Sequence, residues 1–384
     1  MNATLDALLE RAYARTRNGA PRDPRRARAL LDALAIPDPP HAVVVVGTNG
    51  KGGVATRIAA GLQAAGRRPL RFLSPHVERF HERIAVDGVP IPDDAVAAFL
   101  RAILDAPAAT DAAFFDLTLA MALAHGATHR APWAVLEAGV GGARDATRAV
   151  RRVRAVVVTN VGADHLATLG PTLADVARAK AGAIRPGVPV VSAAQGDAAD
   201  VVADVARARG APLSRVAAED VRGGIDAVGA ALARATLRRL ALDRAARDAA
   251  LQAAEVRPRL PARRERFRLP EGRTVLLDGA HNPPAARALA DEAPEGAHLL
   301  LGVSARKDAA AIRAAFADAA RVVLTGLPGD AVAWPDDPAY VPDPDAALAR
   351  ALADLPPGAT LIATGSLHLA GRWRPPLRAR ASGA

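Results

Sequence analysis

A glycine-rich loop with a single lysine is the segment whose residue types point most directly to chemistry. It follows the apolar run Ala42–Val46 and reads Gly47, Thr48, Asn49, Gly50, Lys51, Gly52 and Gly53. Glycines let backbone amides approach a phosphate, a helix after the loop presents its positive end, and Lys51 adds a compact charge. The spacing departs from the common Gly-x4-Gly-Lys-Ser/Thr pattern, so a glycine-rich turn without a ligand is the alternative. We predict a phosphate-binding loop.

Lysine is rare in this chain. Only Lys51, Lys180 and Lys307 occur, and the other 47 of the 50 basic residues are arginine. An amine can lose its proton and react, whereas a guanidinium cannot, so the retained lysines are candidates for chemistry. Lys180 lies late in a predicted helix, Leu173–Ala183, where a favourable interaction with the helix C-terminus is the other explanation.

Polar side chains also stand where predicted strands end. Glu137 closes the strand Ala134–Glu137 and runs into a glycine turn, and His165 follows the strand Ala155–Thr159. Ligands of α/β sheets bind at the carboxyl ends of strands, so both residues are site candidates. For His165, a hydrogen-bonded structural role is equally compatible with its chemistry.

Short apolar strands alternate with amphipathic helices along the whole chain. The predicted strands are Ala42–Val46, Ala134–Glu137, Ala155–Thr159, Val188–Val191, Thr274–Asp278, His298–Leu301, Arg321–Leu324 and Thr360–Thr364. Continuous Val and Leu runs are typical of parallel strands covered on both faces, which predicts the α/β class. A proline-containing break near Glu255–Pro261 divides the chain into domains of residues 1–255 and 256–384. The tail from Arg372 is expected to be frayed.

Composition narrows the function classes. Half of the 384 residues, 51%, are apolar, no cysteine is present, and no stretch of 18 uncharged apolar residues occurs. We therefore expect a cytoplasmic protein with no membrane partner and with oxygen or imidazole as its metal ligands. The net charge of +10 comes with only 3% aromatic residues, so we expect no nucleic-acid partner and an anionic substrate instead.

Several motifs together resemble one known family. Besides the loop at Gly47, they are Ser74-Pro75-His76, His81-Glu82-Arg83-Ile84, Glu137-Ala138-Gly139-Val140-Gly141-Gly142, Asp145-Ala146-Thr147, Thr159-Asn160-Val161-Gly162-Ala163-Asp164-His165 and Leu277-Asp278-Gly279-Ala280-His281-Asn282-Pro283. In this combination the chain resembles the folylpolyglutamate synthase/dihydrofolate synthase branch of the Mur ligases. The resemblance implies a P-loop-type ATPase domain with a mainly parallel sheet, followed by a smaller Rossmann-like glutamate-ligase domain.

The resemblance also implies an activity. In such enzymes a carboxylate of dihydropteroate or a reduced folate attacks the γ-phosphate of ATP, and the amine of L-glutamate then displaces phosphate from the acyl phosphate. ATP and Mg²⁺ are the implied cofactors, and a monomer is expected. Both steps concentrate negative charge, which lysine, magnesium and helix N-termini can stabilise.

Roles for individual residues follow from the matched motifs. In the first domain, the resemblance implies that Lys51 contacts the ATP phosphates, that Glu137 and His165 bind Mg²⁺, and that Lys180 becomes a carbamate that binds a second Mg²⁺. It also implies that the segment Ser74, Pro75 and His76 touches the pterin-bearing substrate. In the second domain, the resemblance places Arg263 on an ATP phosphate, Asp278 on the ribose, and His281 and Asn282 near the phosphates or the incoming amino acid. A surface position is the alternative for Arg263.

Three positions depart from the family pattern. Gly53 stands where relatives carry a serine or threonine that holds a magnesium ion, so Thr56 or water would have to substitute. Arg148 replaces an asparagine, and Gly229 lies in a stretch where relatives have an adenine-contacting asparagine. These departures leave two further hypotheses open. One is a related amide ligase acting on another carboxylate, and the other is a non-catalytic, nucleotide-binding regulatory relative.

Overall fold

The computed structural model describes residues 3–15, 22–330, 334 and 336–382. Contacts within it divide the chain into two compact units, residues 1–75 with 81–258, and residues 76–80 with 259–384. The second unit is therefore discontinuous in sequence, because five residues from the first half of the chain group with it. None of the described helices is long and apolar enough to cross a bilayer.

The first unit is built on an eight-stranded sheet with the order β4-β3-β2-β5-β1-β6-β7-β8. Its strands are β1 His41–Val46, β2 Pro69–Phe72, β3 Ile84–Val86, β4 Val89–Pro90, β5 Trp133–Glu137, β6 Val153–Val158, β7 Val190–Ser192 and β8 Leu213–Arg215. The six strands from β2 to β8 in this order run parallel, while β3 and β4 pair antiparallel at one edge. The mostly parallel sheet predicted from the Val and Leu runs is confirmed.

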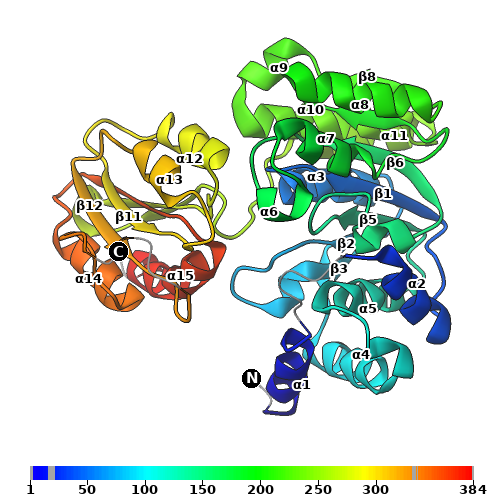
Figure 1. Cartoon of the computed structure of the whole chain (residues 1–384), viewed down its shortest axis with the longest axis horizontal. Coiled ribbons are helices and arrows are strands. Elements are labelled where there is room, and N and C mark those ends of the chain that lie inside the picture. The colour runs from blue at the N-terminus through cyan, green and yellow to red at the C-terminus, as the bar shows by residue number, and fades with distance from the viewer. Residues whose placement is uncertain (1–2, 16–21, 331–333, 335, 383–384) are drawn as a thin grey trace. The chain divides into compact units, whose positions relative to one another are not determined.

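Helices cover this sheet on both faces. They are α1 Ala3–Tyr13, α2 Pro24–Ala33, α3 Lys51–Ala64, α4 Asp93–Asp105, α5 Phe114–Thr128, α6 Leu166–Leu169, α7 Leu173–Ala181, α8 Gly196–Ala208, α9 Ala218–Arg222, α10 Gly224–Arg239 and α11 Arg244–Glu255 (Figure 1). The chain moves from β1 to β2 in one direction along the sheet and from β6 to β7 in the other. Right-handed crossovers therefore place α3 and α7 on opposite faces.

The core of the first unit reflects this layering. Val44 and Val46 of β1 pack in one cluster with residues of α7 and α8. On the other face, α3 packs against α10 and α11. A side chain at Gly61 of α3 would collide with Leu237 and with the carbonyl of Ala250, so this glycine permits the close approach of the three helices. The loop predicted to bind phosphate thus connects a strand and a helix that are both firmly packed.

The second unit has a five-stranded sheet with the order β12-β11-β13-β10-β9. The strands are β9 Glu265–Arg268, β10 Thr274–Leu277, β11 His298–Gly302, β12 Arg321–Thr325 and β13 Thr360–Thr364, and the helices are α12 Pro283–Ala290, α13 Ala309–Ala314, α14 Pro344–Ala353 and α15 Leu367–Ser382. Only β9 is antiparallel to its neighbour. Residues of α14 and α15 pack on one face, and residues of α12 and α13 on the other (Figure 1).

The tail predicted to be frayed is instead helical. The helix α15 continues through Arg372 despite Pro375 and Pro376. Trp373 and Leu377 are fully buried, and the indole Nε1 of Trp373 donates to the carbonyl of Pro344 at 3.0 Å. Burial of two large apolar side chains outweighs the unfavourable composition, so the expectation of a frayed tail is wrong.

Candidate functional site

The loop between β1 and α3 is clamped by the end of β6. The amide of Asn49 donates to the side-chain oxygen of Asn160 at 2.8 Å, and the hydroxyl of Thr159 donates to the carbonyl of Asn49 at 2.7 Å. The hydroxyl of Thr48 exchanges hydrogen bonds with the backbone of Gly162, at 2.9 and 3.1 Å. These contacts fix the loop conformation before any ligand is present, which is what a phosphate site requires.

Two glycines make the loop geometry possible. Gly47 has a φ of 149°, and a Cβ there would collide with the Thr159 hydroxyl. Gly50 has a φ of 79° at the residue that caps α3, a left-handed conformation that favours glycine. The first helical residue is Lys51, whose Nζ donates to the carbonyl of Thr48 at 3.1 Å. The predicted strand, loop and helix order is therefore present.

Lys180 of α7 reaches the base of this loop. Its Nζ donates to the carbonyl of Gly47 at 2.7 Å, and the residue is only 2% exposed. Burial, helped by the nearby charge of Lys51, lowers the pKa of Lys180 from 10.5 to about 7, although Asp164 and Asp145 act in the opposite direction. A substantial fraction of this amine is therefore neutral near pH 7, in direct contact with the candidate phosphate loop.

Glu137 is buried at the end of β5. One of its carboxylate oxygens, Oε2, accepts the amide of Ser74 at 3.0 Å, just before the cis peptide bond between Ser74 and Pro75. Its negative charge acts on the pKa of both Arg71 and Arg83, raising each against the lowering effect of burial. The segment predicted to touch the acceptor, which begins at Ser74, is thus hydrogen-bonded to Glu137, the carboxylate predicted to bind metal.

Asp145 holds the glycine turn that follows Glu137. Its carboxylate accepts the amides of Gly139 and Val140 at 2.9 and 3.1 Å, and both the amide and the hydroxyl of Thr147. Burial raises the pKa of Asp145, while these hydrogen bonds lower it. Asp145 stands in one of the motifs that carry the family resemblance, but the motif alone does not reveal this role.

His165 stands beside a second acidic residue. It caps the N-terminus of α6 with a φ of 54°, its amide donates to Asp164 Oδ1 at 2.9 Å, and its ring Nε2 lies 3.8 Å from Asp164 Oδ2. The sequence reasoning passed over Asp164, which also acts on the pKa of Lys180. The pairing of an exposed imidazole with a buried carboxylate is compatible with a metal ligand and its orienting partner.

The donor set fits a phosphate-bound magnesium ion better than a metal held by protein alone. In the described ranges, no three His, Asp or Glu side chains form a group that could hold a metal. Mg²⁺ is usually bound through one or two carboxylates, with phosphates and water as the other ligands. Glu137 and His165 could supply such a share. A Cβ at Gly53 would meet nothing within 4 Å, and the hydroxyl of Thr56 is buried with no hydrogen-bond partner in the described structure.

In the second unit, Asp278 organises the turn that bears Arg263. It follows β10, and its two oxygens accept the amides of Arg264 and Ala280, each at 2.8 Å. Burial raises the pKa of Asp278, with Arg263 as the largest opposing influence. The structure thus brings two of the predicted ATP-binding residues of this unit near one another.

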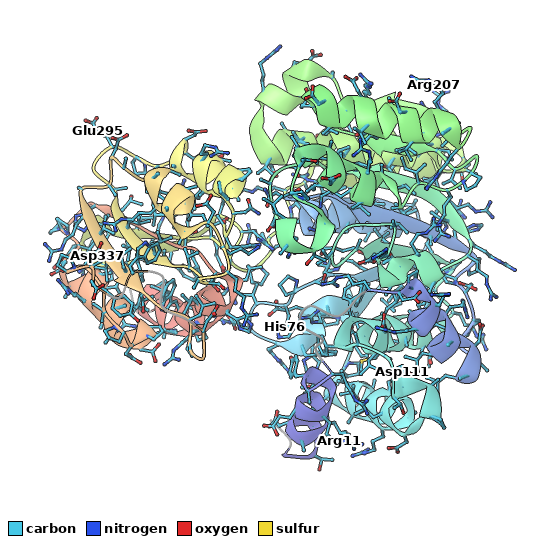
Figure 2. All side chains as sticks on the ribbon, viewed as in Figure 1. Arg11, His76, Asp111, Arg207, Glu295 and Asp337 are labelled. Atoms are coloured by element: carbon cyan, nitrogen blue, oxygen red, sulfur yellow. The ribbon has the colours of Figure 1, made fainter. Side chains whose placement is uncertain are left out.

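His281 and Asn282 follow directly. The ring Nδ1 of His281 lies 2.8 Å from the carbonyl of Gly279. Asn282 is buried and caps α12, with Oδ1 accepting the amide of Ala285 at 3.0 Å. Capping gives Asn282 a structural role that its motif did not reveal, while its contact with substrate stays a prediction. His76 belongs to the second unit and is labelled in Figure 2.

Comparison with known proteins addresses the family. Residues 262–367 match the glutamate ligase domain of Mur ligases. The chain is 40% identical to the folylpolyglutamate synthase of Lacticaseibacillus casei over 47% of this chain and 44% of that protein. It is 32% identical to the dihydrofolate synthase/folylpolyglutamate synthase of Escherichia coli over 65% of this chain and 63% of that protein.

Solved structures match over nearly the whole length. The apo form of the L. casei enzyme is 27% identical with a TM-score of 0.79, covering 98% of this chain and 100% of that one. E. coli FolC in complex with DHPP and ADP is 25% identical with a TM-score of 0.81, covering 98% of both chains. Over nearly its whole length the chain therefore has the fold of the folylpolyglutamate synthase/dihydrofolate synthase family of Mur ligases. The sequence alignments nevertheless span less than half of the L. casei relative and less than two thirds of the E. coli one.

Proposed function

We propose that this protein is an ATP-dependent ligase that joins L-glutamate to dihydropteroate or to a reduced folate. Support comes from relatives that were crystallised with the corresponding ligands. One is FolC with DHPP and ADP, and another is a bifunctional folylpolyglutamate synthase/dihydrofolate synthase with Mn, AMPPNP and L-glutamate bound, 26% identical with a TM-score of 0.82. That match covers 97% of this chain and 98% of the other.

The observation that carries the proposal is the contact between Lys180 and the phosphate loop. A buried amine with a pKa of about 7 is poised on the carbonyl of Gly47. A neutral amine can add CO₂ to form a carbamate with loss of a proton, whereas arginine cannot. We propose that Lys180 acts in this form. A merely structural cation at a helix C-terminus would not need to be buried to this extent.

In the first step, we propose that the loop from Gly47 to Gly53 holds the ATP phosphates through its amides and through Lys51. The acceptor carboxylate then attacks the γ-phosphorus, the bond to the β,γ-bridging oxygen breaks, and ADP leaves. Because phosphoryl transfer depends mainly on positioning and electrostatics, a pre-formed loop is an effective catalyst. Ser74, Pro75 and His76 are proposed to contact the acceptor.

Glu137, His165 and carbamylated Lys180 are proposed to hold Mg²⁺. When bound, the ion neutralises charge that develops on the phosphate oxygens. The residues themselves contribute fixed positions, since Glu137 is tied to the amide of Ser74 and His165 to Asp164. Thr56, or water, is proposed to take the place of the hydroxyl that Gly53 lacks.

In the second unit, we propose that Asp278 contacts the ribose and Arg263 an ATP phosphate. His281 and Asn282 are proposed to orient glutamate. The glutamate amine attacks the carbonyl carbon of the acyl phosphate, a tetrahedral intermediate forms, and phosphate and a proton leave as the amide is made. We further propose that the protein works as a cytoplasmic monomer.

A non-catalytic nucleotide-binding protein is the second candidate, and Gly53 is the observation that favours it. Phosphate release from ATP in the presence of Mg²⁺ and L-glutamate tests both. The acceptors compared are dihydropteroate, tetrahydrofolate and none. Release that requires both acceptor and glutamate, with an amide product of matching mass, is expected. ATP binding without release would instead support the second candidate.

A further inference from the structure

The segment His76–Phe80 is docked on the C-terminal helix α15. Val77 packs against the core cluster that includes Trp373 and Leu377. A Cβ at Gly371 would collide with the carbonyl oxygen of Val77, so glycine at this position allows the two backbones to touch. The residues that directly follow Ser74 and Pro75 are therefore part of the second unit's packing.

Glu78 secures this segment through two arginines of α15. Nη1 of Arg374 lies 2.5 Å from Glu78 Oε1, and Nη2 of Arg378 lies 2.9 and 2.8 Å from the two carboxylate oxygens. The side chains of Glu78 and Arg374 are only 17% and 18% exposed. Partial burial makes this pair less sensitive to screening than a surface ion pair.

The same guanidinium holds a second segment. Nε of Arg374 donates to Glu265 Oε2 at 2.7 Å and Nη2 donates to Oε1 at 2.8 Å, a bidentate pair. Oε2 of Glu265 also accepts the amide of Ala262 at 2.9 Å. Both neighbours of Arg263, Ala262 and Arg264, have left-handed φ values of 49° and 53°. A conformation that is unfavourable for these residues persists only when its surroundings hold it.

We propose that Arg374 is a positioning residue that holds both the segment His76–Phe80 and the turn around Arg263 in place. The contacts run from Glu78 through Arg374 and Glu265 to the amide of Ala262. This inference rests on the proposed function, in which Ser74, Pro75 and His76 contact the acceptor and Arg263 contacts an ATP phosphate. Neither Glu78 nor Arg374 needs to touch a substrate.

Replacing Glu78 or Glu265 tests the two contacts of Arg374 separately. In Glu78→Gln, we expect KM for dihydropteroate to rise about tenfold with KM for ATP changed less than about twofold, since the charge-assisted contacts with Arg374 and Arg378 are both weakened. In Glu265→Gln, the effect should fall on KM for ATP instead. Arg374→Ala should raise both. Because Arg378 still pairs with Glu78 when Arg374 is replaced, adding Glu78→Gln to Arg374→Ala should raise KM for dihydropteroate further, but by less than Glu78→Gln does alone.

Arg372→Ala is the matched control. Arg372 lies on the same helix and pairs with Asp345 at 2.7 Å, but it does not contact Glu78 or Glu265. We expect wild-type values of both KM and of kcat. Arg374→Lys is informative as well, because an ammonium cannot reproduce the bidentate pair. We expect its KM values to lie closer to those of Arg374→Ala than to those of the wild type.

Hydrogen–deuterium exchange of the ligand-free protein provides a readout independent of activity. Faster exchange is expected over residues 76–83 in Glu78→Gln, over 259–268 in Glu265→Gln, and over both in Arg374→Ala. Unchanged exchange, or equal effects of both carboxylate variants on both KM values, would overturn the inference. If the wild-type protein forms no amide, the proposed function fails, while exchange still decides whether Arg374 holds both segments.

Discussion

The candidate residues of the two units are held in different ways. In the first unit, Lys180, Asn49 and Glu137 are fixed by hydrogen bonds in which the partner is a backbone group or a neighbouring amide side chain. In the second unit, the carboxylates of Asp278 and Glu265 accept backbone amides of the Arg263 turn, and Glu265 is itself paired with Arg374. A backbone partner cannot be removed by substitution, whereas an ion pair can be removed by changing one side chain. Replacing a site residue of the first unit should therefore remove a reactive group while the surrounding geometry is kept. Replacing one of the second unit should instead displace the groups around it.

Replacing Lys180 should produce the largest effect. In Lys180→Ala we expect turnover to fall by about 100-fold or more, as when a transition-state contact is lost, while the fold is retained. Lys180→Met, which keeps the apolar stem, should lose as much activity. Steady-state phosphate release and urea unfolding measure the two properties. Partial recovery of Lys180→Ala by added short carboxylic acids would sharpen the carbamate proposal, and retained turnover would remove Lys180 from the mechanism.

Removing the charge of Asp278 tests the second unit. An asparagine has one acceptor oxygen, so it cannot accept the amides of both Arg264 and Ala280 as the carboxylate does. We expect ADP binding, measured by calorimetry, to weaken about 10-fold in Asp278→Asn, with a smaller change in turnover at saturating ATP. Asp291→Asn, an exposed position at the end of α12, is the control. Equal losses in both variants would show that the effect is not local to the turn.

A hydroxyl at position 53 should strengthen the metal site. Since a side chain at Gly53 meets nothing within 4 Å, Gly53→Ser should be accommodated without rearrangement. We expect the Mg²⁺ concentration for half-maximal activity to fall by up to about 10-fold. Gly53→Ala separates the hydroxyl from the gain in helix propensity. If Thr56 now supplies the missing oxygen, Thr56→Val should raise the Mg²⁺ concentration for half-maximal activity, and adding Gly53→Ser should bring it back to the wild-type value. If neither hydroxyl changes this concentration, the ion does not lie here.

The smallest expected effect is a pH dependence of stability. With a pKa of about 7 in the folded protein and an ordinary value of 10.5, Lys180 is protonated in both states below pH 7. Between these values the unfolded chain binds more protons, so the destabilising effect of Lys180 shrinks as pH rises. The free energy of unfolding of Lys180→Met minus that of wild type should therefore be smaller at pH 9 than at pH 6.5. A difference that does not vary with pH would contradict the lowered pKa.

The same contrast explains what could be predicted from sequence. All eight predicted strands are present, with ends shifted by no more than two residues, because buried parallel strands leave continuous apolar runs. Five strands of two to four residues, among them β8 and the charged β9, were not predicted. The candidate phosphate loop and Glu137 could be proposed from the sequence because strand, turn and polar residue are adjacent in the chain.

Contacts between distant residues left no such pattern. Glu78 and Arg374 are 296 positions apart, and one arginine among 47 carries no mark that separates it from the rest. The clamp of Thr159 and Asn160 on the phosphate loop joins segments 110 and 111 positions apart. The motif of Thr159 and Asn160 is visible in the sequence, but its contact with the loop follows only from the pairing of β6 with β1.

The five-residue insertion of His76–Phe80 into the second unit has a consequence for dissecting this protein and for recombining it with its relatives. A fragment beginning at Arg259 would lack Val77 and Glu78, which would uncover Gly371 and deprive Arg374 and Arg378 of the Glu78 carboxylate. An exchange of C-terminal halves at the linker would combine one parent's segment with the other parent's helix. Chimaeras should therefore fold best when residues 76–80 and α15 are inherited from the same parent.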